Sequence, residues 1–267
     1  AAALVWKAEG GGGLPFFRPT AAVLLASQEL ILAAGPVLRR FQVIQSQWTV
    51  LGEPLLLPQT ILGLAEWNGH LVTLSSDGFR LLSLESFTGT NGDAMTPQSW
   101  RNPLELIEVS VEATQHVQLP SHVDTPTLGT AAVMPSTAGN AMAVVLYGSG
   151  GLQLCRASNG TVLTLDFISS LKPAGFLPSS HSLHFSPDRP NEPMVLWSMG
   201  STQQLSAVNF ESGKILTTFQ AAGDVASDAS STSLVTGNSS HLVLVRFEAS
   251  TASLSIFSTP YPTLDFG

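Results

Sequence analysis

Three groups of residues in this chain have types and spacings that catalysis or ligand binding uses. His181 and His184 are three residues apart, but in a β-strand that spacing sends the two side chains to opposite faces. Ser149 lacks the glycine two positions before it that a hydrolase nucleophile elbow has, so we interpret its Gly-Ser-Gly setting as a hairpin turn. The four glycines at 10–13 precede no helix whose N-terminus would bind phosphate. The sequence therefore assigns no catalytic, cofactor-binding or metal-ligating residue.

Short strands joined by tight turns are the elements that would position any functional side chain. In residues 70–89, a strand with apolar residues on both faces reaches Asp77-Gly78, whose residue types favour a hairpin turn, and a second strand follows. The same plan recurs along the chain at residues 21–44, 143–165, 193–219 and 231–257. Five copies indicate an array of similar β units.

The spacing of these units favours a propeller. Their first turns, at Ser27, Gly78, Gly150, Gln203 and Ser239, are separated by 51, 72, 53 and 36 residues. Four-stranded propeller blades repeat every 40 to 50 residues or so, and an insertion would account for the longest step. The pattern therefore predicts an all-β propeller.

We expect one β-propeller domain over residues 1–267, with about five to six four-stranded blades. The strand at residues 4–8 is expected to pair beside residues 254–257, closing the last blade and removing its open edge. Residues 90–127 are expected to form an irregular insertion, and residues 259–267 an extended C-terminal arm.

Finer expectations follow from local patterns. Residues 61–67 should be the innermost strand of the second unit. The segment at 48–57 is expected to cross to that unit, with Pro54 and Pro58 marking the connection. Alternating residues at 104–111 predict an outer strand within the insertion. Residues 167–172 are compatible with a short helical turn.

One repeat carries a family resemblance. Residues 205–216, LSAVNFESGKIL, resemble the repeat of quinoprotein-type (PQQ-like) β-propellers, which are related in shape to WD-repeat propellers. The tryptophan that usually follows this step is replaced by Thr217, and by Thr164 in the similar stretch at 152–163. The order of units from 71 to 257 also resembles the luminal propeller of the large first subunit of the ER membrane protein complex. That resemblance implies a scaffold in a membrane-associated complex, with other protein subunits as partners.

Composition narrows the class of partner. The chain has 267 residues, of which 44% are hydrophobic and only 11% charged, and a charge-poor surface is expected to leave patches for protein contacts. The net charge of -8, with 11 Lys and Arg, argues against nucleic acid as a partner, because nucleic-acid binding needs a basic surface. The chain has no uninterrupted apolar run of membrane-spanning length, so we expect no transmembrane segment of its own.

Localisation rests on the cysteine and the sequons. The single cysteine, Cys155, lies in a predicted strand and reads as a buried structural thiol. Sequons at Asn159 and Asn238 fall on predicted turns, where glycans could be attached. The chain begins with Ala1 and not Met, which is compatible with removal of a targeting sequence. A lumenal or organellar location is favoured, with a cytoplasmic one left open.

The sequence therefore predicts a non-catalytic propeller that acts as a scaffold or accessory subunit of a larger complex. The alternative from another class is a carbohydrate-active or carbohydrate-binding five-bladed propeller, because glycosidases with this fold place carboxylates from inner strands around a central channel. Glu66, Asp124 and Asp224 are the acids nearest the predicted inner strands, whereas Asp166 and Glu211 fall on outer strands or turns.

Overall fold

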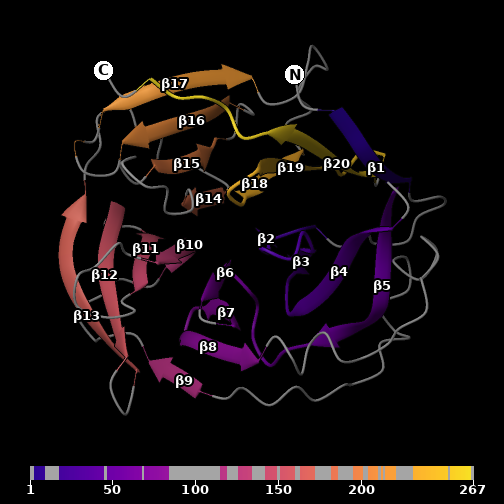
Figure 1. The fold of residues 1–267 in the computed structure, drawn as a ribbon. Coiled ribbons are helices and arrows are strands. Elements are labelled where there is room, and N and C mark those ends of the chain that lie inside the picture. The colour runs from indigo at the N-terminus through magenta and orange to yellow at the C-terminus, as the bar shows by residue number, and fades with distance from the viewer. Residues whose placement is uncertain are drawn as a thin grey trace.

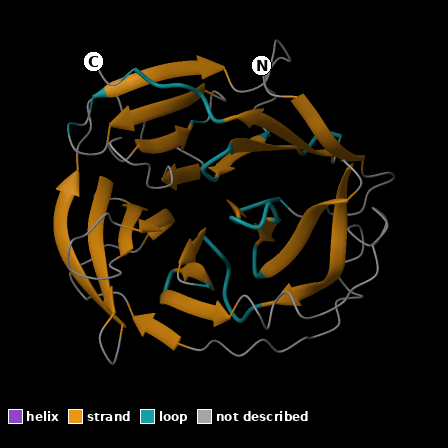
Figure 2. Ribbon diagram, in the orientation of Figure 1, coloured by secondary structure: helices purple, strands orange, loops and turns teal. Residues whose placement is uncertain are grey.

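The computed structural model shows strands arranged in a ring (Figure 1). It describes residues 3–9, 18–44, 47–67, 69–83, 115–118, 126–133, 142–148, 151–159, 163–171, 182–185, 195–200, 204–209, 212, 214–220, 231–251 and 253–265. Within these residues the regular structure is β, with loops between the strands (Figure 2). No helix in the described part of the chain is long and apolar enough to cross a membrane.

The described strands form five four-stranded antiparallel sheets. The first sheet contains β2 (Ala21–Leu24), β3 (Leu30–Ala34), β4 (Val37–Ile44) and β5 (Gln47–Leu56). The second contains β6 (Gly63–Trp67), β7 (His70–Ser75), β8 (Gly78–Ser83) and β9 (Gln115–Gln118). The third contains β10 (Pro126–Val133), β11 (Met142–Gly148), β12 (Gly151–Asn159) and β13 (Leu163–Leu171).

The fourth sheet contains β14 (Ser182–Phe185), β15 (Val195–Met199), β16 (Gln204–Asn209) and β17 (Ile215–Gln220). The fifth contains β18 (Thr232–Gly237), β19 (His241–Glu248), β20 (Ser253–Pro260) and β1 (Ala3–Glu9). In every sheet the strand order follows the chain, except that β1 joins at the outer edge of the fifth. Figure 1 shows β2, β6, β10, β14 and β18 nearest the centre of the ring.

The closing strand lies where the sequence predicts it. β1 pairs antiparallel with β20, with Leu4 opposite Phe257 and Ala8 opposite Leu254, and the register shifts between Leu4 and Trp6. Each of the five repeats predicted from the sequence falls within one sheet. The predicted innermost strand at 61–67 is also confirmed, as β6.

Two local expectations are wrong. Residues 48–57 do not cross between units, because most of them form β5, the outer strand of the first sheet, where an edge position tolerates Pro54. Residues 167–171 are not helical, because they continue β13 and pair with β12. The expected strand at 104–111 lies outside the described residues, and the described outer strand of that sheet is β9.

The Asp77-Gly78 hairpin is shifted by one residue from its predicted position. Ser75 pairs with Gly78, so Ser76 and Asp77 form the turn and Gly78 follows it at a φ of 134°. The Asp77 carboxylate accepts bonds from both terminal nitrogens of Arg80, at 3.0 and 2.7 Å. Asp77 therefore has a structural role in this turn, as its residue type predicts.

The hydrophobic core lies between neighbouring sheets. Ile31 and Leu71 belong to a cluster shared by the first and second sheets, and Val72 to one shared by the second and third. Leu234 packs with the first sheet, whereas Val235 packs with the fourth. Because each sheet is covered on two faces, its strands are apolar on both, as in the fully buried β3.

Candidate functional site

Polar side chains join the innermost strands of neighbouring sheets. Ser182 Oγ on β14 donates to the carbonyl oxygen of Val235 on β18 and accepts from its N–H, each at 3.2 Å. One residue further along β18, Thr236 Oγ1 accepts a 2.9 Å bond from the N–H of Leu24 on β2. Alternation along β18 thus links it to the fourth sheet by one face and to the first sheet by the other.

Asn238 extends this connection to the loop between β2 and β3. Its Nδ2 donates to the carbonyl oxygen of Leu25 at 3.3 Å, while its Oδ1 accepts from the N–H groups of Ser240 and His241 at 2.9 and 3.0 Å. The residue is only 8% exposed. A glycan on Nδ2 would displace the Leu25 loop, so the fold argues against use of this sequon. The side chain of Asn159, at the end of β12, lies outside what the structure describes.

Glu66 holds the same loop from the second sheet. Its Oε2 accepts a 2.8 Å bond from the N–H of Ala26, which lies beyond the end of β2. Asp124 and Asp224 lie outside the described residues, so the structure does not bring the three candidate acids together. The contact gives Glu66 a structural role between the first and second sheets.

A buried ion pair fixes the loop to its own sheet. Glu29 is 4% exposed and Arg40, on β4, is 7% exposed, and their side chains meet at 2.5 Å. This pair is absent from the predictions made from the sequence. Two consecutive arginines inside a largely apolar strand, at 39–40, are the signal in the sequence that an acid should lie on a neighbouring segment.

The loop held by these contacts is strained at its tip. Gln28 is the one non-glycine residue of the described chain with a positive φ, 69°. Its N–H donates to the Leu25 carbonyl oxygen at 2.9 Å, and the Leu25 N–H donates to the Glu29 carbonyl oxygen at 2.8 Å. Residues 26–28 are exposed. A loop held from three sides in a rare conformation presents its polar tip in a fixed geometry, and strain of this kind is common at functional sites.

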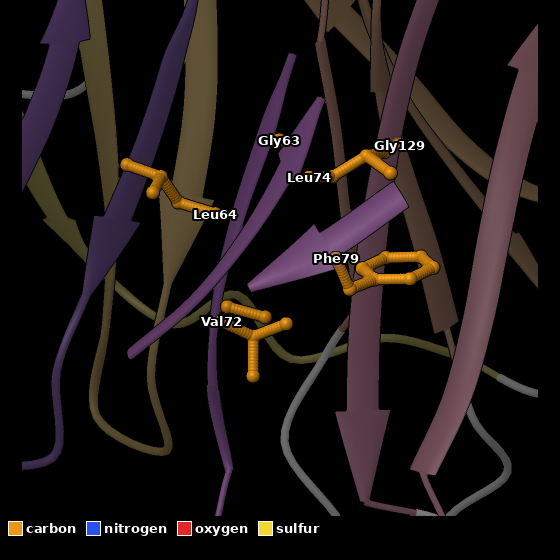
Figure 3. A pocket seen from close by; sticks show the side chains of 7 residues that line it. Gly63, Leu64, Val72, Leu74, Phe79 and Gly129 are labelled. Atoms are coloured by element: carbon orange, nitrogen blue, oxygen red, sulfur yellow. The ribbon is translucent and has the colours of Figure 1, made fainter. Parts of the chain in front are cut away.

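An apolar pocket lies between the second and third sheets (Figure 3). Gly63 on β6 and Gly129 on β10 line it together with Leu74 and Phe79. Its volume of about 10 Å³ is no larger than one water molecule needs. The pocket is a packing gap and offers no polar group to a substrate.

Among the described residues, His184 is the titratable group whose pKa the fold shifts most. Burial lowers its pKa from 6.5 to about 3, and its Nε2 atom is buried without a hydrogen-bond partner among the described residues. His181, Ser149 and the glycines at 10–13 lie outside the described residues. Within the part of the chain that the structure describes, no three His, Cys, Asp or Glu side chains gather as a metal site would require.

Cys155 lies on β12 with no exposed surface, as its predicted role as a buried thiol requires. Burial raises the pKa of its thiol to about 11. The thiol is therefore protonated at neutral pH and a poor nucleophile.

No protein-family model matches this chain. No curated protein sequence matches it either. Among solved structures, it is similar to the crystal structure of Myxococcus xanthus glutaminyl cyclase, with a TM-score of 0.56 and 11% identity. The match covers 98% of this chain and 97% of that one. At this identity the likeness shows the fold alone, a β-propeller-like all-β fold.

Proposed function

We propose that this chain is a non-catalytic, five-bladed propeller that acts as a scaffold or accessory subunit of a larger protein complex. The observation that carries the proposal is the use of polar side chains around the inner strands. Ser182, Thr236, Asn238 and Glu66 each bond to the main chain of a neighbouring sheet or its loop. These bonds connect neighbouring sheets of the ring, and a ring connected in this way is rigid, as a scaffold must be.

The tip of the loop at 26–28 is the part of the described surface best suited to a protein partner. It is exposed, polar and held in place by Glu66, Asn238 and the Glu29–Arg40 pair. A rigid loop loses little conformational entropy on binding, which favours recognition. The irregular stretch at 90–127 is a second candidate contact, and a membrane-associated complex is the proposed setting.

The experiment compares partner capture by three versions of the chain. The wild type, Ser27→Arg and the matched control Ser250→Arg would be cross-linked in native material and their partners quantified by mass spectrometry. Ser250 is exposed in the turn between β19 and β20. That turn lies at the opposite end of the sheet stack from the 26–28 tip, because successive strands run antiparallel. The proposal expects a stable set of partners that Ser27→Arg loses and Ser250→Arg keeps.

Enzymatic assays test the opposite outcome. The matched solved structure is a glutaminyl cyclase, so release of ammonia from a peptide with N-terminal glutamine is one assay. Hydrolysis or binding on a glycan array is the other, because the alternative function is carbohydrate-active. Turnover or glycan binding that Glu66→Gln abolishes, while the variant keeps the wild-type melting temperature, would overturn the scaffold proposal.

A further inference from the structure

The seam between the fourth and fifth sheets carries the segment that follows β20. Trp197 on β15 is fully buried, and its Nε1 donates a 2.7 Å bond to the hydroxyl of Tyr261. The two rings meet edge to face, with centroids 5.8 Å apart and planes at 86°. Leu264 packs against the same cluster. Residues 261–265, hereafter the arm, are thus docked on the chain's own seam, where an extended arm was predicted.

His184 lies beside this docking point. It pairs with Trp197 across β14 and β15, so both side chains are on the same face, toward the fifth sheet. On that side His184 Nε2 lies against Gly237 of β18, and a Cβ at Gly237 would come 3.3 Å from it. The residue as a whole is partly exposed, whereas its Nε2 atom is buried.

Burying the protonated form of this imidazole costs much more free energy than burying the neutral form. In the neutral form Nε2 can be the bare ring nitrogen, and only a weak acceptor is left without a partner. Protonation places an N–H and a positive charge against β18, where Nε2 has no hydrogen-bond partner among the described residues. A buried cation without a partner is strongly unfavourable, so the protonated ring has to leave the seam.

The charged groups around His184 offer little compensation. Strands β10, β15, β16 and β18 carry no ionisable side chain. On β19, Arg246 faces the same seam, but it pairs with Glu248 at 3.1 Å and lies opposite Ser233, four residues along β18 from Gly237. The arm itself carries Tyr261 and the exposed Asp265.

His241, at the start of β19, is the nearest histidine in the fifth sheet. Its Nδ1 lies 2.9 Å from Ser240 Oγ. It follows Asn238 and Ser240 in a turn that contacts the first sheet through Asn238. The same turn also holds the arm, because the Tyr261 N–H donates a 2.9 Å bond to the Ser240 carbonyl oxygen and His241 pairs with Pro260. His241 therefore adjoins the arm, whereas His70, at the start of β7 in the second sheet, lies in a sheet that neighbours neither the fourth nor the fifth.

We propose that His184 is a proton-operated latch: protonating it opens the seam between β14 and β18 and releases the arm from Trp197. Protonation of His184 is linked to release of the arm because His184 and Trp197 lie on the same face. An imidazolium that moves out of the seam removes the packing that orients the indole toward Tyr261. The proposal is independent of the scaffold function.

The pH window follows from the sign of the shift. The pKa of His184 is lowered from 6.5 to about 3, so the folded state favours the neutral form. That stabilisation is complete above pH 6.5 and is lost progressively as the pH falls toward 3. Two pH units below the unfolded pKa, the opening equilibrium should favour the released arm on the order of 100-fold more than at neutral pH.

The test measures hydrogen exchange of the arm, residues 261–265, by mass spectrometry between pH 7.5 and 4.5, corrected for the pH dependence of chemical exchange. The protection of the arm should fall on the order of 100-fold in the wild type and much less in His184→Gln. His70→Gln, in the second sheet, is the matched control and should respond as the wild type does. Equal responses of the wild type and His184→Gln would overturn the proposal.

A second measurement needs no variant of the histidine. An NMR titration of the folded wild type follows the His184 ring signals directly, and the proposal expects no protonation of the docked form above pH 5. A midpoint of 6 or higher with the arm still protected would overturn the latch. Tyr261→Phe, which removes only the hydroxyl acceptor, should raise arm exchange at pH 7.5 and leave the His184 titration in place.

Discussion

Gly63 on β6 lies so close to Gly129 on β10 that a Cβ at Gly63 would overlap the Gly129 carbonyl oxygen and come 2.9 Å from its carbonyl carbon. Both glycines face the seam between the second and third sheets (Figure 3). The contact is between main chains, so no side-chain rotation can relieve it. This pair sets the distance between the two sheets near the centre of the ring.

Gly63→Ala should therefore destabilise the fold. We expect a loss of about 1–3 kcal/mol in the free energy of unfolding, because a methyl group inserted into a closed contact displaces backbone. Urea unfolding followed by circular dichroism measures it. The exposed variant Ser250→Ala is the control and should change stability by less than about 0.5 kcal/mol. A Gly63→Ala protein as stable as the wild type would contradict the close approach of β6 and β10.

Removing one charge of the buried Glu29–Arg40 pair should destabilise the fold more than removing both. Removing one partner leaves a buried charge, so Glu29→Met should cost about 3–5 kcal/mol of unfolding free energy. The double variant Glu29→Met with Arg40→Met removes both charges and should recover most of that loss. A double-mutant cycle of unfolding free energies measures the coupling, and additive losses would show that the two side chains do not act as a pair.

The arrangement of the sheets could be predicted from the sequence because the same strand–turn unit is repeated along the chain. Turn residues recurring between apolar strands located all five units, and the apolar segment at 4–8 predicted the closing strand. β5 was missed because its glycine and proline resemble a connection, and only its pairing with β4 makes it a strand. Local patterns do not contain such long-range pairing.

The side-chain contacts between neighbouring sheets could not be predicted from the sequence in the same way. Asn238 was noticed only as a sequon, although its amide bonds a loop more than 200 residues away in the chain. The sequence presents His184 only as a possible metal ligand beside His181, because nothing in it shows that His184 packs against Gly237. Each of these roles depends on which sheets become neighbours in the ring, which spacing along the chain does not encode.

Asn238 should carry no glycan in the folded protein, and its substitution should be costly. Asn238→Ala removes the acceptor for Ser240 and His241 and leaves the Leu25 carbonyl without that donor. The expected loss is about 1–3 kcal/mol of unfolding free energy. Intact-mass and peptide mass spectrometry of protein made in a glycosylating host tests the first part. A folded chain glycosylated at Asn238 would contradict the buried position of the amide.

The thiol of Cys155 provides a probe for opening of the third sheet. Burial raises its pKa from 9.0 to about 11, so the folded state favours the protonated thiol. The stabilisation from this group is present below pH 9 and is lost as the pH rises from 9 toward 11. Because the thiolate is the nucleophile, iodoacetamide should alkylate the folded chain slowly at pH 8 and the urea-unfolded chain fast. Since Cys155 is the only cysteine in the chain, mass spectrometry reads this one site directly. Equal alkylation rates in the two states would show that β12 is open to solvent and that the second and third sheets are not packed over this side chain.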